Sequence, residues 1–218
     1  TWHTCAAGKD CKMRSVDVVV PVSSVLDSDR RRALEFVLSR ISDMQPASVV
    51  VCECSSDGLP HAPVPSGPSR AVVKSPWNKP VAVNEAVQKH TSAEWIFVLD
   101  ADVAIDFEQV RAQFERLPDG VKFVRPCRSI ARLGREVSQQ MMDGLVAWPK
   151  LPEKGREEVL VTGGAFLIRR DLFMSLRGFD ERFDIYMEDT DLKHRLMALK
   201  VVPSVLDLQG YHLYHTPL

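Results

Sequence analysis

The feature that most constrains the fold is the alternation of short apolar runs with segments of helical spacing. The first run, Ser15 to Val22, is rich in valine and stops at two serines, as strands buried on both faces do. The next segment, Asp27 to Ile41, carries one apolar helical face behind an acidic start. A second apolar run follows at Ala47 to Cys52. Strand, helix and strand in this order predict a parallel sheet.

The rest of the chain continues this alternation. The stretch from Gly58 to Ser69 contains four prolines and two glycines, which predicts a surface loop, and Lys150 to Glu158 is a second polar loop. We therefore expect an α/β fold with a central, mostly parallel sheet flanked by helices. The further expected strands are Arg70–Lys74, Trp95–Leu99, Val159–Val161, Ala165–Ile168 and Val201–Leu206, and the further expected helices are Pro80–His90, Asp106–Leu117, one within Ser129–Trp148, and Asp189–Leu199.

Size and composition limit the possible functions. At 218 residues and 45% hydrophobic, the chain suits one domain, which we place at residues 13–218, with residues 1–12 as an N-terminal extension or remnant. Lys and Arg total 28 against 29 Asp and Glu, so we expect no nucleic-acid partner. No apolar run approaches the roughly 20 residues of a transmembrane helix. An odd number of irregularly spaced cysteines favours a reducing, cytoplasmic location.

Two aspartates follow the most strand-like run of the chain. Trp95 to Leu99 reads WIFVL, and Asp100-Ala101-Asp102 comes directly after it. In open α/β sheets, ligands bind at the carboxyl ends of the strands. Residues two apart in an extended chain point the same way, so both carboxylates are expected to face one cation that bridges to diphosphate oxygens. The competing interpretation is helix capping, because Asp102 or Asp106 can start the next helix.

A second acidic cluster, Glu188-Asp189-Thr190-Asp191, stands at the start of the last expected helix. Acidic residues in a first helical turn oppose the helix dipole, which is the structural interpretation. The functional interpretation is a general base, because an attacking hydroxyl must lose its proton. Crowded carboxylates raise one another's pKa, which makes one of them a better base near neutrality.

Glycines and histidines add two further candidates. Gly163 and Gly164 precede an expected strand, where they form a tight turn or let the backbone approach a ligand closely. The tail from Tyr211 to His215 carries two histidines. If the tail is extended, His212 and His215 face opposite sides, so only one of them reaches the site, and we select His215. An imidazole beside carboxylates favours manganese over magnesium.

Six segments, in this order, resemble the GT-A glycosyltransferases, especially the inverting family 2 and galactosyltransferase-like enzymes. The likeness covers Ser15 to Pro217 and implies a single GT-A (Rossmann-like) catalytic domain. The segments are DVVVPVSS, SVVVCECSSDG, NKPVAVNEAVQKHTSAEWIFVLDADV, TGGAFLIRRDLFMSLRGFDERF, MEDTDLKHRL and YHLYH.

The resemblance also implies a role for each matching position. The family has an acidic pair at the end of its second strand, where this chain has Cys52 and Glu53, so Glu53 is expected to take over the contact to the base. The remaining implied roles are Pro21, Val22 and Ser23 beside the nucleotide base; Lys79 and Asn84 on a helix that borders the donor pocket; Asp100, Ala101 and Asp102 as the metal motif, with Asp102 the direct ligand; Gly163 and Gly164 along the donor sugar; Asp189 as the base with Glu188 beside it; and His215 completing the metal shell.

The activity implied by the resemblance is transfer of a sugar from a nucleotide-sugar donor to a hydroxyl acceptor, with inversion at the anomeric carbon. The donor is expected to be UDP-linked, with guanine and thymine nucleotides left open by the Cys52 and Glu53 departure, and the metal is Mn²⁺ or Mg²⁺. A glycan, glycoprotein or glycolipid is the expected acceptor. The domain can also be one unit of a longer, multidomain chain.

Three other interpretations compete with this one. A nucleotidyltransferase that makes nucleotide sugars shares an acidic metal site, but such enzymes carry a glycine-rich basic loop after the first strand, where this chain has Pro21-Val22-Ser23-Ser24. A noncatalytic sugar-binding module is the second, and retention of both acidic clusters argues against it. A retaining transferase is the third, because a fold does not determine stereochemistry.

Overall fold

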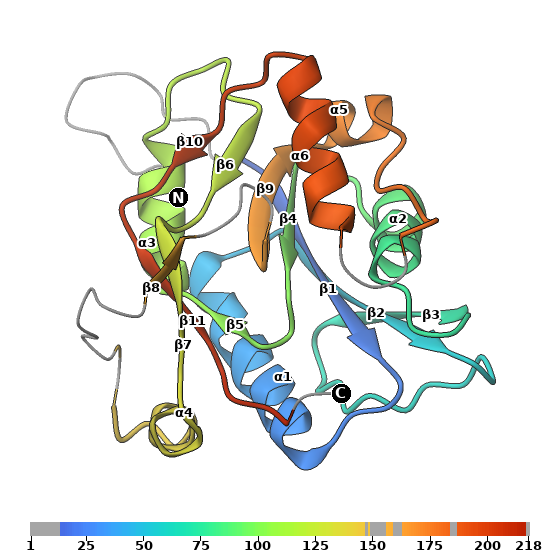
Figure 1. The fold of residues 1–218 in the computed structure, drawn as a ribbon, viewed down its shortest axis with the longest axis vertical. Helices are drawn as coiled ribbons and strands as arrows, with labels where there is room; N and C mark the ends of the chain where they lie inside the picture. The colour runs from blue at the N-terminus through green and yellow to red at the C-terminus, as the bar shows by residue number, and fades with distance from the viewer. Residues whose placement is uncertain (1–13, 147, 149–155, 159–162, 184–186, 217–218) are drawn as a thin grey trace.

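A seven-stranded sheet forms the centre of the molecule (Figure 1). The computed structural model describes residues 14–146, 148, 156–158, 163–183 and 187–216. The strand order is β10-β6-β9-β4-β1-β2-β3, and every neighbouring pair is parallel except the two that involve β9. The predicted mostly parallel sheet is therefore confirmed. Its strands are β1 Val16–Ser23, β2 Ser48–Ser55, β3 Ser69–Lys74, β4 Trp95–Leu99, β6 Phe123–Arg125, β9 Ala165–Arg169 and β10 Ser204–Val205.

Strands β1 and β4, at the centre of the sheet, explain the continuous apolar runs of the sequence. All five residues of β4 are buried, and only the last residue of β1 is partly exposed. Strands covered on both faces need apolar side chains in both directions, which produces continuous runs instead of alternation. The carboxyl ends of β1 and β4 consequently lie at one edge of a buried sheet.

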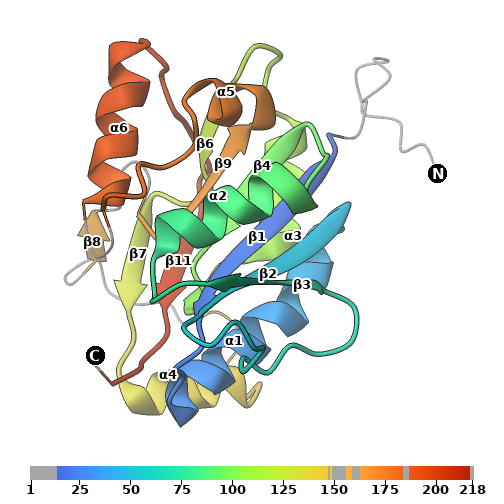
Figure 2. The same ribbon diagram turned by 90° about the vertical axis from the view of Figure 1, so that its right-hand side faces the viewer.

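Helices cover both faces of this sheet (Figure 2). Helices α1 and α3 belong to one core layer, whereas α2, α5 and α6 belong to the other. Asp27, Asn78 and Asp106 cap three of them, each accepting a bond from a backbone N–H of the first turn. The helices are α1 Ser28–Ile41, α2 Lys79–His90, α3 Phe107–Glu115, α4 Arg135–Met142, α5 Arg170–Ser175 and α6 Glu188–Ala198, with a 3₁₀ turn, η1, at Ser42–Met44.

A second, four-stranded sheet has the order β5-β11-β7-β8. Its strands are β5 Val103–Ala104, β7 Ser129–Arg132, β8 Arg156–Glu158 and β11 Gln209–His212. The antiparallel pair β5 and β11 sets His212 opposite Val103, and thus beside the residue that precedes Val103. This small sheet brings the C-terminal tail to the end of β4.

Some sequence expectations differ from the structure. The helix expected within Ser129–Trp148 is confined to α4, because Ser129–Arg132 pairs with β11 as strand β7. Leu145, which belongs to the expected range but lies beyond α4, is 75% exposed. Within Val201–Leu206 only Ser204 and Val205 form strand. Leu199, the last residue of the expected final helix, lies beyond α6 and is 55% exposed. The expected strand Val159–Val161 lies outside the described residues. Across the described part of the chain, none of the helices combines the length and the hydropathy needed to span a bilayer.

Candidate active site

The chain turns immediately after β4, and this turn separates the two aspartates of the Asp100-Ala101-Asp102 motif. The Asp100 amide donates to the carbonyl of Gly164 at 2.8 Å, and the Val103 amide donates back to the carbonyl of Asp100 at 3.1 Å. In a turn the rule for extended residues no longer holds, and the two carboxylates contact different side chains, so a cation shared by both stays a prediction. Asp102 lies against two histidines, and Asp100 lies against Lys79.

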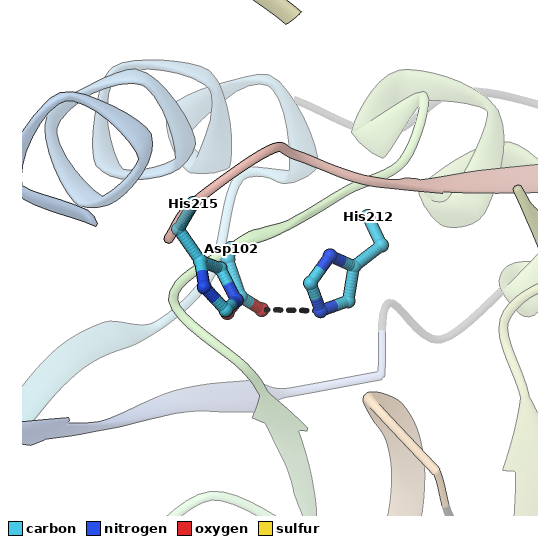
Figure 3. A group of neighbouring side chains, drawn as sticks. All are labelled: Asp102, His212 and His215. Carbon is cyan, nitrogen blue, oxygen red and sulfur yellow. Dashed lines mark ion pairs between the residues drawn. The ribbon is translucent and has the colours of Figure 1, made fainter. Parts of the chain in front are cut away.

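Asp102, His212 and His215 form what we call the histidine cluster (Figure 3). Nε2 of His215 is 3.1 Å from Oδ2 of Asp102, and Nε2 of His212 is 3.8 Å from Oδ1. One ligand atom from each residue lies within 4.8 Å of the others. One carboxylate and two imidazoles suit a divalent transition metal such as manganese, and three protein ligands leave positions open for a substrate.

Hydrogen bonds define how the imidazoles are oriented. Nδ1 of His212 is 3.0 Å from the carbonyl oxygen of Leu213, and Nδ1 of His215 is 3.0 Å from that of Thr216. A carbonyl only accepts, so each Nδ1 carries a proton and donates it. In a neutral ring the lone pair is then on Nε2, the atom that faces Asp102, whereas in protonated His215 this atom donates to the Asp102 carboxylate. This is the arrangement by which proteins prepare histidines to bind metals.

The charges of the histidine cluster reinforce each other. Burial raises the pKa of Asp102, but the bond from His215 and the nearby His212 outweigh burial, so the net pKa is lowered. The same bond is the main reason why the pKa of His215 is raised, with burial acting against it. Asp102 therefore remains a carboxylate, which is the form that binds a cation.

His212 is the residue that the sequence interpretation missed. The expectation that His212 and His215 face opposite sides is wrong, because strand β11 ends at His212 and residues 213–216 do not continue it. The Leu213 amide donates to the carbonyl of Asp102 at 2.8 Å, which holds the tail along the turn. His212 and His215 are three positions apart, and in a segment that is not a strand this spacing allows both rings to lie on the same side.

A second group, which we call the lysine cluster, gathers around Lys79 at the start of α2. Its Nζ is 2.9 Å from Oδ1 of Asp100, 3.6 Å from Oε1 of Glu188 and 3.6 Å from Oδ2 of Asp189. The Lys79 side chain is only 11% exposed. It therefore joins the end of β4 to the first turn of α6, and brings together both acidic clusters of the sequence.

The lysine cluster shifts the pKa values of its members. Burial lowers the pKa of the Lys79 ammonium, but Asp100, Asp189 and Glu188 outweigh burial, so the net pKa is raised and the charge is kept. Burial raises the pKa of Asp189, Lys79 lowers it, and Asp100 and Glu188 raise it again, which leaves it at about 7. A carboxyl group with this pKa can take up and release a proton near neutral pH.

Gly164 occupies a position that excludes other residues. Its φ is +73°, and a Cβ there would lie 2.9 Å from Cδ1 of Ile130 and 3.2 Å from Cγ2 of Val103. Its carbonyl accepts the Asp100 amide, so this glycine helps to fix the turn. Gly163 is partly exposed beside it.

The other predicted site residues have different surroundings. Pro21 and Val22 are buried at the end of β1, and Ser23 and Ala101 are partly exposed. Asn84 is buried and exchanges bonds with the backbone of Phe179, donating to its carbonyl at 3.0 Å and accepting from its amide at 2.9 Å. Asn84 thus ties α2 to the turn after α5, outside both clusters. Glu53 is fully buried, with its carboxylate bonded to backbone amides.

Solved structures that share this fold include GT-A glycosyltransferases. GalNAc-T7 with UDP, GalNAc and Mn²⁺ aligns over 98% of this chain and 47% of its own, with a TM-score of 0.62 and 11% identity. Glucosyl-3-phosphoglycerate synthase from Mycobacterium tuberculosis, in complex with Mn²⁺, UDP and glucosyl-3-phosphoglycerate, aligns over 99% and 80%, with a TM-score of 0.55 and 16% identity. S. aureus TarS 1–349 aligns over 91% and 60%, with a TM-score of 0.55 and 14% identity.

The chain has the GT-A glycosyltransferase fold.

Sequence relatives agree with this GT-A assignment, although no family model matches the chain. An N-acetylglucosaminyl-diphospho-decaprenol L-rhamnosyltransferase of Mycobacterium tuberculosis is 27% identical over 82% of this chain and 70% of its own length. The O-antigen biosynthesis protein RfbC of Myxococcus xanthus is 30% identical over 60% of this chain, a match that spans only 12% of RfbC. The predicted relationship to GT-A glycosyltransferases is confirmed.

Proposed function

We propose that this GT-A domain transfers a sugar from a nucleotide-sugar donor to a hydroxyl acceptor in a reaction that needs a divalent cation. The observation that carries the proposal is the turn after β4, from which Asp102 enters the histidine cluster and Asp100 enters the lysine cluster. A site for a cation and a candidate base thereby lie at the carboxyl edge of the sheet, where ligands bind in open α/β folds.

Asp102, His212 and His215 would hold the cation. Because each Nδ1 donates to a backbone carbonyl, the Nε2 atoms of the two neutral imidazoles would be the ligand atoms. A bound Mn²⁺ or Mg²⁺ would offset the charge of the departing diphosphate. Mn²⁺ is the first choice because two of the three ligands are imidazoles. The presence of Mn²⁺ and UDP in two structural neighbours supports the same choice. A direct role of Asp100 on the metal stays a prediction.

Asp189 would act as the general base that accepts the proton of the attacking hydroxyl. Its pKa of about 7 suits this role, and Lys79, which also contacts Glu188, holds it at the start of α6. In a direct displacement, the hydroxyl oxygen attacks the anomeric carbon as the bond to the diphosphate breaks. The product then has the inverted configuration at that carbon, which analysis of the product anomer by NMR checks.

The donor and acceptor are proposed by chemical class. UDP-linked sugars are the first choice for the donor, with GDP- and dTDP-linked sugars as alternatives. The mycobacterial relative is named for a lipid-linked N-acetylglucosamine acceptor, which favours a glycolipid among the acceptor classes. Exposed loops such as Gly58 to Ser69 offer the variable surface on which acceptors are commonly recognised.

The test is a screen of nucleotide sugars in which release of the nucleoside diphosphate is followed with and without Mn²⁺. We expect Mn²⁺-dependent release from one class of donor. Asp102→Ala should lose metal-dependent binding of the donor, whereas Asp189→Asn should bind the donor and lose turnover. Asp119→Asn is the matched control, because the Asp119 carboxylate is fully exposed.

The outcomes separate the candidate functions. Donor binding without turnover in the wild-type chain would favour the noncatalytic module. Full turnover in Asp189→Asn would remove this residue from the mechanism, and absence of any nucleotide-sugar binding would overturn the proposal as a whole.

A further inference from the structure

Glu53 places a carboxylate in the interior at the carboxyl end of β2. The residue is 0% exposed. Oε1 accepts the backbone amide of His61 at 2.7 Å and that of Ala62 at 3.2 Å, while Oε2 accepts the Ala62 amide at 3.1 Å. A buried carboxylate is costly unless such donors satisfy it. In this state Glu53 has no surface with which to touch a ligand, contrary to the base contact expected from the sequence.

The bonds of Glu53 hold one specific segment, residues 57–62, which we call the β2–β3 strap. Asp57 accepts the Leu59 amide at 2.8 Å and contacts Nε2 of His61 at 2.9 Å. The strap continues to Ala62, which is 3% exposed and packs in the core. Within it, residues 57 and 59–61 are exposed. Glu53 is thus the buried anchor of an exposed turn.

Arg70 supplies a second anchor from the other side. Its guanidinium donates to the carbonyl of Ala62 at 2.5 Å. The two polar groups of the Ala62 backbone are therefore both occupied, the amide by Glu53 and the carbonyl by Arg70. These two contacts fix the conformation of the backbone at Ala62, within a proline-rich loop that lacks regular structure.

The strap starts at the sheet edge where the nucleotide is proposed to bind. Val22 is the partner of Glu53 in the β1–β2 register, and the Ser24 amide donates to the carbonyl of Cys54 at 3.0 Å. The carboxyl ends of β1 and β2 are thus adjacent, and the strap leaves directly from this edge. Ligands bind at such an edge in open α/β sheets, so we expect the exposed strap residues to border the nucleotide.

We propose that Glu53 is a positioning residue for recognition of the nucleotide base: it fixes the main chain of the strap, and the strap forms the wall that the base meets. This inference rests on the proposed function. Glu53 then influences which base is bound without touching it, and base selection depends on main-chain groups and exposed side chains of residues 57–61. A wall that is already fixed avoids the entropy of ordering a loop when the ligand binds.

The test measures binding of UDP, GDP and dTDP in the presence of Mn²⁺ by calorimetry, for the wild-type chain and Glu53→Ala. We expect the Kd of the preferred nucleotide to rise by about tenfold and the preference among the three to shrink, because the wall becomes mobile. The Kd for Mn²⁺ alone should stay within about twofold, since the histidine cluster does not involve Glu53. Hydrogen exchange at the amides of His61 and Ala62 should accelerate in the variant.

Asp17→Ala is the matched control. Asp17 is 2% exposed, lies in the adjacent strand β1, and accepts two successive loop amides, those of Ser92 and Ala93, at 2.7 Å each. It anchors a loop at the opposite end of the strands. Its removal should lower stability without changing base preference. If Glu53→Ala does not fold, Glu53→Gln keeps one oxygen acceptor and should show the same change to a smaller extent.

Three outcomes overturn the inference, and they differ in what they say of the proposed function. If the wild-type chain discriminates among the nucleotides and the Glu53 variants do so equally, Glu53 has no positioning role and the transferase proposal stands. If the wild-type chain binds none of the nucleotides or nucleotide sugars, both proposals fail. An equal loss of preference in Asp17→Ala would reduce the effect to general stability.

Discussion

At the scale of single residues, Asp100 and Asp102 contact different partners although they are only two positions apart. Asp100 carries the contact to the Lys79 ammonium, and Asp102 carries the contacts to the imidazoles. Since Asp189 shares the same ammonium, a change at the end of β4 is transmitted to the candidate base. The properties of Asp189 are therefore set largely by its neighbours, which gives a prediction about pH.

The pH dependence of turnover should follow Asp189. Its pKa of about 7 is raised mainly by burial, and a base works only when deprotonated, so activity should rise with pH through an inflection near 7. The measurement is kcat/KM against pH at saturating Mn²⁺, which keeps the histidines bound to metal. A profile already flat from pH 5 would contradict this assignment.

Both histidines should contribute to the affinity for Mn²⁺. His212→Ala and His215→Ala each remove one Nε2 from the cluster around Asp102, so we expect the Kd for Mn²⁺ to rise by about tenfold or more in each. Titration calorimetry or the signal of free Mn²⁺ in electron paramagnetic resonance measures the change. His194→Ala, at an exposed position of α6, is the control. An unchanged Kd in His212→Ala would return the cluster to the single histidine expected from the sequence.

At the scale of elements, the turn after α5 locks onto α2. Gly178 has φ +69°, and a Cβ there would lie 2.1 Å from Oδ1 of Asn84. That oxygen accepts the Phe179 amide, while the guanidinium of Arg195 in α6 donates to the carbonyl of Gly178 at 2.8 Å. Three helices thus meet at one glycine, and Asn84 serves this junction.

Substitution of Gly178 should destabilise the fold. Gly178→Ala introduces both an unfavourable φ and a clash with Asn84, and we expect a loss of about 2–4 kcal/mol in the free energy of unfolding. Gly120→Ala introduces an unfavourable φ without a clash, because Gly120 has φ +90° and nothing lies within 4 Å of the added Cβ. It should cost about 1 kcal/mol, and the difference between the two variants then measures the effect of the clash. Urea denaturation compares the two variants, and equal losses would show that the Asn84 contact is unimportant.

At the scale of the whole molecule, the cysteines that the structure describes lie in the two core layers. Cys52, Cys54 and Cys127 are buried, at 0%, 1% and 0% exposure. Burial raises the pKa of the Cys52 and Cys127 thiols to about 12, and that of Cys54 above its usual range. These thiols are core side chains.

Alkylation of the native protein should therefore spare these three thiols. At pH 7.5 iodoacetamide should leave Cys52, Cys54 and Cys127 unmodified over a time in which Ser66→Cys, at an exposed loop position, reacts fully, because thiolate and access are both needed. Peptide mass spectrometry identifies each site, and the three thiols should react once the protein is unfolded. Rapid labelling of Cys127 in the native state would contradict the packing described above.

The sequence by itself determined the elements with strong local signals. Runs such as Trp95–Leu99, buried on both faces, and helices with capping residues such as Asp27 and Asp106 were predicted within a few residues of their bounds. The order of the elements then gave the parallel sheet and the resemblance to GT-A enzymes. Residues that precede or follow these elements, such as Asp100 and Asp189, were identified as candidates for the same reason.

Only the tertiary structure decided how those candidates are grouped. A turn at Ala101, a backbone bond from Leu213 and the pairing of β5 with β11 bring His212 to Asp102 and leave Asp100 to Lys79. Glu53 and Asn84 acquired backbone partners. These outcomes depend on contacts between residues far apart in the chain, for which local spacing and propensity carry no signal, whereas strands and helices depend on neighbours that the sequence already displays.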